Sequence, residues 1–292
     1  EGFRECVALL LNLPNDLVAE ILSAHAAATG RTPLHEAMAG GHILVAEALV
    51  NAGAEVNGVD LGGGTPLHAA GANNRKDWVG FLIERGAEVA TTNNDDITAL
   101  QLAMQKNFDG CLQVLVQLGG DVNSMSNDPG MEKFTLCHRA AKQSDNTFLD
   151  FLLQRGAKND IIDPNWGTPL HVAAAVSSEQ CVALLLRDAD QKANDRIGDR
   201  CAKGISPLHI ACSQGNMRIV RSMLFAQNFT SLDMRDGRGA TPLYEAVVNG
   251  HVGVAWLLLS RGADVNGVYV DTDLDDEAQV AVASCAAAVG SD

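Results

Sequence analysis

Apolar and polar residues recur along the chain in blocks, and each block predicts a pair of short helices. The best copy, residues 167–174, reads Gly-Thr-Pro-Leu-His-Val-Ala-Ala. Thr168 is suited to cap a helix, Pro169 fits its first position, and Leu170 is expected to point into a core. The small alanines favour close helix packing. A second apolar run follows each block and ends at a glycine, as at Gly262, where a left-handed helix stop is expected.

The block recurs at a nearly constant spacing. Its copies begin at residues 32, 65, 98, 135, 168, 206 and 241, so the steps are 33, 33, 37, 33, 38 and 35 residues. The copies at 98 and 135 are weaker because they lack the proline. Such a period predicts a stack of similar units, each packed on its neighbours.

This order of cap, helix, turn, helix and glycine stop resembles the ankyrin repeat over about residues 30–266. The resemblance implies an all-α solenoid of about seven helix-turn-helix repeats with projecting hairpin fingers. The repeats would start near residues 30, 63, 96, 133, 166, 204 and 239. We expect residues 1–29 to be a degenerate N-terminal capping repeat with helices over 3–12 and 17–25, the second capped by Asn15 or Asp16. Residues 267–292 are expected to be an acidic C-terminal capping segment with a last helix over 279–289.

Composition narrows the class of partner. The chain has a net charge of −15, which disfavours nucleic acid and anionic membrane surfaces as partners. It has no apolar run long enough to span a membrane, so no membrane insertion is expected, and no secretory signal is visible. Its seven cysteines show no C-x-x-C spacing, which is typical of reduced thiols. We therefore expect an intracellular, cytoplasmic protein.

The candidate chemical groups already have structural roles in the repeat. Of the eight histidines, five follow the Thr/Ser cap by three residues, two occupy a Gly-His helix break, and only His25 is left over. We therefore expect no catalytic residue, no metal, no cofactor and no small-molecule substrate. The acidic stretch 271–277 is similar to a calcium loop. It departs from that pattern at Asp276 and Val282, where Gly and Glu are needed.

What remains is binding. In ankyrin proteins, partners usually meet the finger tips and the exposed side of the first helices. Trp166 lies at a finger tip, either as an exposed contact residue or flat on the neighbouring finger, and Phe134 has a comparable place. Lys133, Arg139 and Lys142 lie near Phe134, so an acidic peptide is expected there. Further candidates in one continuous groove are Gln143, Gln101, Gln105, Lys106, Asn73 and Asn74.

These observations predict a non-enzymatic module for protein–protein interaction, a scaffold or adaptor that binds a protein or peptide through its concave face and finger tips. Two alternatives stay open: an adaptor or regulatory part of a larger complex, enzymatic or not, and a structural subunit of an assembly. An enzyme ranks third. The resemblance also implies hydroxylation of asparagines that close a Val-Asn hairpin, namely Asn57, Asn123 and Asn266.

Overall fold

The computed structural model describes residues 14–127, 133–187, 201, 203–226 and 232–265. The chain divides into two compact units, residues 1–128 (unit 1) and 129–292 (unit 2), which are described separately. Within the described residues every regular element is a helix, and β pairing is confined to isolated bridges at Thr92–Thr98 and Asp163–Gly167. The predicted all-α repeat fold is confirmed.

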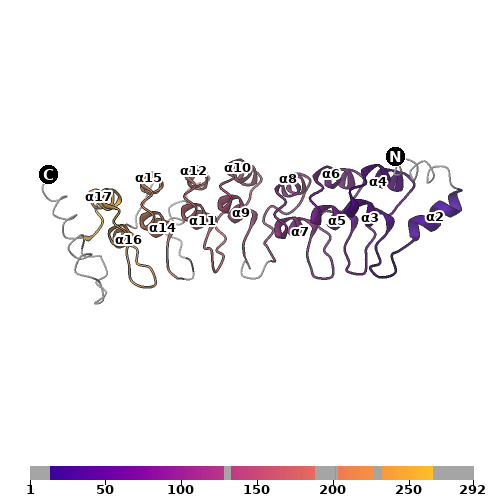
Figure 1. Ribbon diagram of the computed structural model, residues 1–292. Helices are drawn as coiled ribbons and strands as arrows, with labels where there is room; N and C mark the ends of the chain where they lie inside the picture. The colour runs from indigo at the N-terminus through magenta and orange to yellow at the C-terminus, as the bar shows by residue number, and fades with distance from the viewer. Residues whose placement is uncertain (1–13, 128–132, 188–200, 202, 227–231, 266–292) are drawn as a thin grey trace. The chain divides into compact units, whose positions relative to one another are not determined.

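Unit 1 contains one single helix and three helix pairs (Figure 1). The single helix is α2 (Asn15–Ser23). The pairs are α3 (Pro33–Gly40) with α4 (Ile43–Asn51), α5 (Pro66–Ala72) with α6 (Lys76–Glu84), and α7 (Ala99–Gln105) with α8 (Asp109–Gln117). The first helices α3, α5 and α7 pack side by side in one layer, and the second helices form another layer, which lies above the first in Figure 1.

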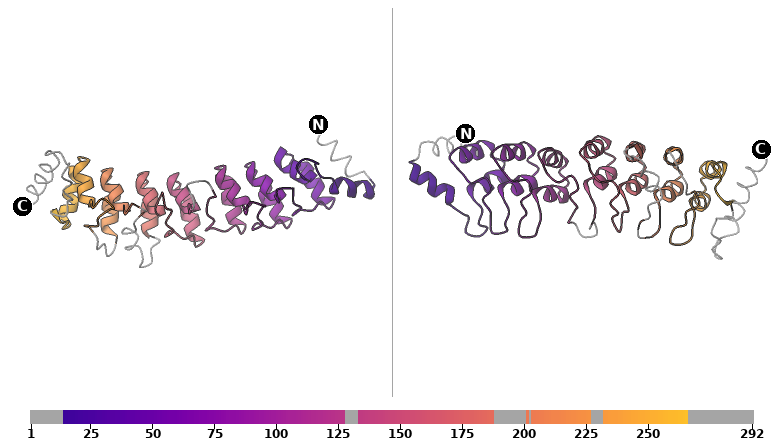
Figure 2. Two further views of the ribbon diagram at one scale, coloured as in Figure 1. Left: turned by 90° about the horizontal axis from the view of Figure 1, so that it is seen from below. Right: turned by 180° about the vertical axis from the view of Figure 1, so that it is seen from behind.

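Unit 2 repeats this arrangement four times (Figure 2). Its pairs are α9 (Leu136–Lys142) with α10 (Asn146–Gln154), α11 (Pro169–Ala175) with α12 (Glu179–Arg187), α14 (Pro207–Ser213) with α15 (Met217–Phe225), and α16 (Pro242–Val248) with α17 (Val252–Ser260). Within each unit taken by itself, long loops between the helix pairs project as fingers.

The helices begin and end where the sequence pattern predicts. Thr168 is the N-cap of α11 and Pro169 its first residue, while Leu170 is 2% exposed in the core. Left-handed glycines end the second helices, as at Gly53 and Gly262 with φ of 96° and 90°. One expectation is wrong in detail: α2 begins at Asn15, after Pro14, and no side chain caps it.

The repeat histidines hold each first helix to the next finger. The backbone N–H of Thr168 donates to His171 Nδ1 at 3.0 Å, so Nε2 carries the proton and donates to the Ile205 carbonyl, also at 3.0 Å. The same bridge recurs at His35, His68, His138 and His209. Burial lowers the pKa of these four side chains below 6.5, which favours the neutral ring that the bridge needs.

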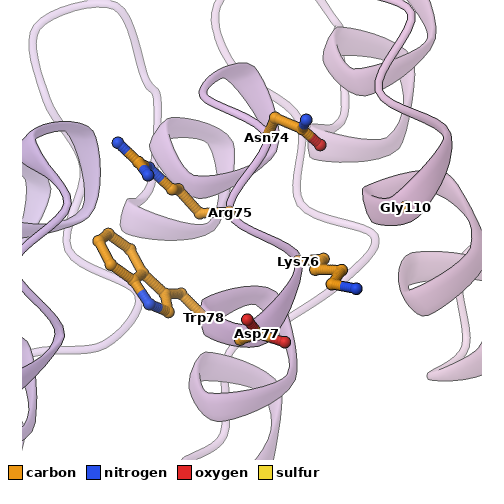
Figure 3. A pocket seen from close by; sticks show the side chains of 6 residues that line it. All are labelled: Asn74, Arg75, Lys76, Asp77, Trp78 and Gly110. Carbon is orange, nitrogen blue, oxygen red and sulfur yellow. The ribbon is translucent and has the colours of Figure 1, made fainter.

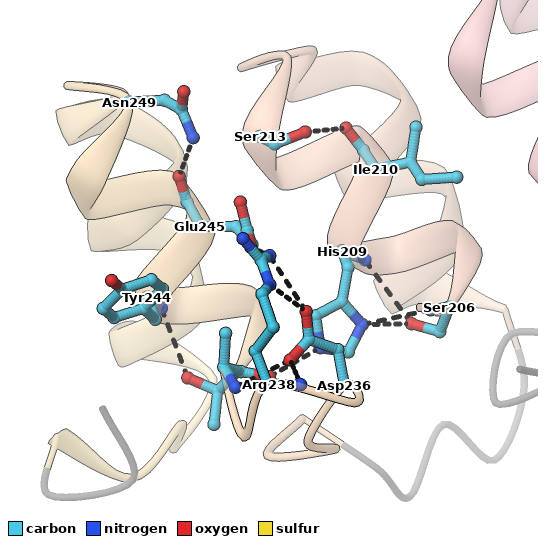
Figure 4. A network of polar contacts seen from close by, with 11 residues as sticks. Ser206, His209, Ile210, Ser213, Asp236, Arg238, Tyr244, Glu245 and Asn249 are labelled. Atoms are coloured by element: carbon cyan, nitrogen blue, oxygen red, sulfur yellow. Dashed lines mark hydrogen bonds and ion pairs between the residues drawn. The ribbon is translucent and has the colours of Figure 1, made fainter. Parts of the chain in front are cut away.

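An acidic or amide side chain closes four of the fingers, at Asp60, Asn93, Asp163 and Asp236. In the last finger, Asp236 Oδ1 accepts hydrogen bonds from the N–H groups of Arg238 and Ala240, and Arg238 pairs with both Asp236 and Glu245 (Figure 4). Burial favours the neutral acid, but these hydrogen bonds and the guanidinium outweigh it, so the pKa of Asp236 is lowered. Asn93 makes the equivalent bonds in an earlier finger. The fingers are therefore built rigidly from within.

Several sequence predictions fall outside the described residues. These are the helices expected over 3–12 and 279–289, the acidic stretch 271–277, and Asn266. Within the helices that the structure describes, none combines the length and apolar character that crossing a membrane requires.

Candidate functional site

Two aromatic rings and one lysine meet at the finger side of the first pair in unit 2. The rings of Phe134 and Trp166 pack edge to face with centroids 5.8 Å apart. The Lys142 ammonium lies 4.2 Å from the centroid of Trp166 and 5.7 Å from that of Phe134. A cation held over aromatic faces in this way is stabilised by about 0.5–2 kcal/mol. We call Phe134, Lys142 and Trp166 the aromatic–lysine cluster.

Local structure fixes the position of this cluster. Asp163 Oδ1 accepts hydrogen bonds from the backbone N–H groups of Asn165 and Trp166, both at 2.9 Å, and so closes the finger that carries Trp166. Asp163 Oδ2 accepts from the N–H of Lys133 in the preceding finger at 3.2 Å. The Phe134 ring also packs 5.1 Å from the ring of His138. The indole is therefore held by two neighbouring fingers.

The three side chains of the aromatic–lysine cluster differ in their exposure to solvent. Phe134 is 4% exposed and serves as a platform, whereas Trp166 is half-buried and Lys142 is exposed in the last turn of α9. The alternative that Trp166 packs on the neighbouring finger is therefore the closer description. Its indole meets that finger edge-on. The arrangement offers an ammonium group, fixed on a hydrophobic base, to an anionic partner group.

The expected exposure of Arg139 is wrong. Arg139 is 7% exposed and has interaction partners within the protein. Every residue of α9 from Leu136 to Ala141 is buried. The helix is enclosed because it packs on both α10 and α11. Gln143, which follows the helix, is exposed as expected.

Two of the predicted partner-binding residues in unit 1, Gln101 and Asn73, make hydrogen bonds within the protein. Gln101 takes the place of the repeat histidine: its Oε1 accepts from the Thr98 N–H at 2.9 Å, and its Nε2 donates to the Met125 carbonyl at 3.0 Å. Asn73 Nδ2 donates to the Ala69 carbonyl at 2.7 Å. These contacts hold the two side chains in place. The remaining candidates are Gln105, which is half-buried, and Lys106 and Asn74, which are exposed.

A cleft of about 400 Å³ opens beside Asn74 in unit 1 (Figure 3). Its lining residues are Asn74, Arg75, Lys76, Asp77, Trp78 and Gly110. The Arg75 guanidinium lies 5.1 Å from the centre of the Trp78 ring. A side chain at Gly110 would meet Lys76, with its Cβ 3.3 Å from the Lys76 Cδ. The sequence prediction included Asn74 and missed Trp78 and Gly110. The available signal was the glycine at the second position of α8.

The predicted hydroxylation sites are tied into the fingers. Asn57 Nδ2 donates to the Gly86 carbonyl and its Oδ1 accepts from the Glu88 N–H, both at 3.0 Å. Asn123 is half-buried and has interaction partners.

Among the described residues, no three His, Cys, Asp or Glu side chains gather as a metal-ion site requires. None of the five described cysteines forms a disulfide, and four of them are buried. Burial raises the pKa of the Cys111 thiol to about 11, so this thiol is neutral at physiological pH.

The paired helices and the fingers between them define the class: a stacked helical repeat protein. The family model described as "Ankyrin repeats (3 copies)" matches residues 1–93, 57–126, 100–195 and 192–268. The chain belongs to the ankyrin repeat family, whose repeats are protein-interaction modules.

Two curated relatives illustrate the similarity. Ankyrin repeat and SOCS box protein 11 of Danio rerio is 32% identical over 108 residues, which cover 36% of this chain and 33% of the relative. NF-kappa-B inhibitor alpha of Homo sapiens is 34% identical over 104 residues, which cover 34% of this chain and 31% of the relative. The matches therefore span about a third of each relative's length.

Two solved structures share the fold. The ankyrin repeat domain of human ASB11 matches with a TM-score of 0.58 and 26% identity, covering 80% of this chain and 99% of that domain. The ankyrin repeat domain of Bcl-3 matches with a TM-score of 0.54 and 27% identity, covering 73% of this chain and 93% of that domain.

Proposed function

We propose that this chain is a non-enzymatic interaction module that binds a protein or peptide through its first helices and finger tips, with an acidic segment of the partner on the aromatic–lysine cluster. The observation that carries the proposal is the Lys142 ammonium held 4.2 Å above the Trp166 ring. An ammonium fixed in this way loses less conformational entropy on binding than a free lysine, so one contact contributes more to affinity.

Charge supports an acidic partner at this place. The chain as a whole carries a net charge of −15, which repels acidic peptides over most of its surface. Lys133 and Lys142 are both exposed in the region of the cluster. A local positive site on an acidic protein directs an acidic segment to one position. Gln143 lies next to Lys142 in the sequence and is exposed beside it.

The test is a quantitative crosslinking pulldown from the native source with the full chain. Lys142→Glu and Trp166→Ala are compared with wild type, and Lys203→Glu is the matched control because it makes the same charge change at another exposed lysine of unit 2. We expect partners to be retained by the control and lost by both cluster variants, with circular dichroism unchanged. Loss of about tenfold in affinity corresponds to about 1.4 kcal/mol. Retention by all three variants would contradict the proposed site.

The candidates outside the cluster belong to the same proposal as secondary contacts. They are Gln101, Gln105, Lys106, Asn73, Asn74 and Gln143. Because Gln101 holds the next finger, its loss should act through stability, while Lys106→Ala should change affinity alone.

The cellular compartment is proposed from the cysteines, which form no disulfide among the described residues. We propose that the protein works in the cytoplasm, since Cys111, Cys137, Cys181 and Cys212 are buried without disulfide partners. The proposed adaptor role, as a part of a larger complex, is distinguished from that of a permanent subunit by size-exclusion chromatography: a well-behaved monomer favours the adaptor, and aggregation of the isolated chain favours the subunit.

A further inference from the structure

The second helix α15 of unit 2 turns arginine and aromatic side chains toward solvent. Its buried side is formed by Ile219, Val220, Met223 and Leu224. Its exposed side is formed by Arg218, Arg221, Ser222 and Phe225. Because these exposed residues recur at helical spacing, they lie on one face of the helix. This face therefore carries two cations and, one turn further on, a phenyl ring.

Arg261, which follows α17 in the next repeat, completes this face. Its guanidinium carbon lies 4.1 Å from the centroid of the Phe225 ring, and one of its N–H groups donates to the Leu224 carbonyl at 3.5 Å. Phe225 is nevertheless 63% exposed. A guanidinium has five N–H donors. The stacked Arg261 therefore keeps donors that a carboxylate of another protein can meet.

Trp256 extends the face onto the neighbouring helix. α15 packs between α12 and α17 in the second-helix layer of unit 2 (Figure 1). Trp256 is the fifth residue of α17, as Arg221 is the fifth residue of α15, and it is 51% exposed. We call Arg218, Arg221, Phe225, Trp256 and Arg261 the arginine–aromatic face.

Residue type, and not exposure, distinguishes α15 from the other second helices of unit 2. The second and fifth residues of these helices lie on the solvent side in each repeat. They are Thr147 and Asp150 in α10, and Gln180 and Ala183 in α12. Among the second helices that the structure describes in unit 2, α15 alone has a cation at both positions.

The positive charge of this face is largely unneutralised. Arg218 Nη1 lies 3.3 Å from a carboxylate oxygen of Glu179, but the Arg218 side chain stays 81% exposed, so water screens the pair. Among the described residues, Arg221 has neither a hydrogen-bond partner nor an ion-pair partner. The whole chain carries a net charge of −15. The two arginines thus form a local positive site on an acidic protein.

We propose that the arginine–aromatic face is a second interaction surface, which binds an acidic helical segment of a protein partner. Carboxylates of the segment pair with Arg218 and Arg221, and its apolar side chains pack on Phe225 and Trp256. Glutamates three or four residues apart share one face of a helix and so match two arginines that are three residues apart on α15. Arginine binds carboxylates in a bidentate manner, and arginine and tryptophan contribute much of the binding energy at protein interfaces.

The test measures binding of a fluorescein-labelled peptide to the full chain by fluorescence anisotropy at low salt. The probe is a monomeric helix of Ala, Leu and Glu with its glutamates on one face. We expect Arg221→Glu to lower the affinity about tenfold, with circular dichroism unchanged. Arg235→Glu is the matched control, because it makes the same charge change at an exposed arginine on a finger of unit 2. We expect the control to retain the affinity of wild type.

The shape of the side chains provides a second comparison. Arg221→Lys keeps the charge but loses the planar guanidinium, so we expect a smaller loss than for Arg221→Glu. Phe225→Ala and Trp256→Ala should each weaken binding of the probe about threefold. Val176→Ala removes an exposed apolar side chain elsewhere in unit 2 and should have no effect. Wild-type affinity in both aromatic variants would contradict the proposed face.

Other results would also overturn the inference. They include absence of probe binding to wild type, and equal losses for Arg221→Glu and Arg235→Glu, which would show attraction by overall charge alone. Tighter binding of a single-stranded oligonucleotide of the same charge, lost in Arg221→Glu, would assign the face to nucleic acid. A dimer in size-exclusion chromatography that Arg221→Glu dissociates would show that a second copy of the chain occupies the face.

Lys142→Glu separates the two proposed surfaces, because the aromatic–lysine cluster lies on a first helix and the fingers, whereas the arginine–aromatic face lies on second helices. Probe binding that is retained in Lys142→Glu and lost in Arg221→Glu would support the arginine–aromatic face, whether or not the aromatic–lysine cluster binds a partner. The reverse pattern would place the probe on that cluster. It would overturn this inference while supporting the proposed function.

Discussion

Replacing His138 tests whether the repeat histidines act through hydrogen bonds that only a properly shaped side chain can make. The Thr135 N–H donates to His138 Nδ1 at 3.1 Å, and His138 Nε2 donates to the Gly167 carbonyl at 2.8 Å. His138→Ala leaves both buried backbone groups without this partner, at about 1–3 kcal/mol each. The Phe134 ring also loses its contact with the imidazole. We expect a loss of about 2–5 kcal/mol in the free energy of unfolding.

His138→Gln should cost far less, because the chain itself shows the substitution. Gln101 accepts from the Thr98 N–H and donates to the Met125 carbonyl in the equivalent place. We expect a loss of about 1 kcal/mol or less for His138→Gln. Urea unfolding followed by the emission of Trp166 reports on this part of unit 2, which matters because long repeat arrays need not unfold in one step. Equal losses for Ala and Gln would refute the hydrogen-bond account.

The pH dependence of the free energy of unfolding gives a further check on the comparison between wild type and His138→Gln. Burial lowers the pKa of His138 in the folded protein below its ordinary 6.5. The unfolded chain therefore takes up a proton first, and the contribution of His138 is fully present above pH 6.5 and is lost as pH falls from 6.5 toward the folded pKa. The stability difference between wild type and His138→Gln should thus change in favour of Gln as pH is lowered from 7.5 to 5.5. A constant difference would contradict the assigned neutral imidazole.

Three further outcomes follow from the structure. Leu170→Ala should lower stability by about 2–5 kcal/mol in denaturant melts, since Leu170 is 2% exposed, and a loss below about 0.5 kcal/mol would contradict its core position. Asp236→Asn should remove acid sensitivity: the folded pKa of Asp236 lies below 3.8, so its contribution is present above that pH and is lost as pH falls through the folded pKa, which acid titration by circular dichroism would show. Hydroxylation of Asn57, Asn123 or Asn266 predicts satellites with one added oxygen in intact-mass spectrometry of native material, and their absence would refute this prediction.

The sequence predicted the parts of the site that depend on local chemistry. The resemblance to the repeat predicts that Trp166 lies at a finger tip, beside Pro164 and Asn165, at a position where the family most often has glycine. Its contact with Phe134 was not predicted, although the repeat period contained the signal: one 33-residue step from residue 134 leads to 167, beside Trp166. Arg139 was expected to be exposed. Its burial depends on how α10 and α11 enclose α9, which the pattern within one repeat does not specify.

By itself, the sequence determined the helix starts, the helix stops and the repeat period, because each depends on a few neighbouring residues: a Thr or Ser cap, a proline in the first turn, and a glycine with positive φ. Only the tertiary structure decided which side chains meet across repeats. The Lys142 ammonium lies over the Trp166 ring. Gln101 makes the hydrogen bond to the next finger that a histidine makes in other repeats. The tertiary structure also left the apolar Val252 and Trp256 exposed on α17, the last helix that the structure describes. These outcomes depend on the packing of one repeat against the next, where residues about 30 positions apart become neighbours.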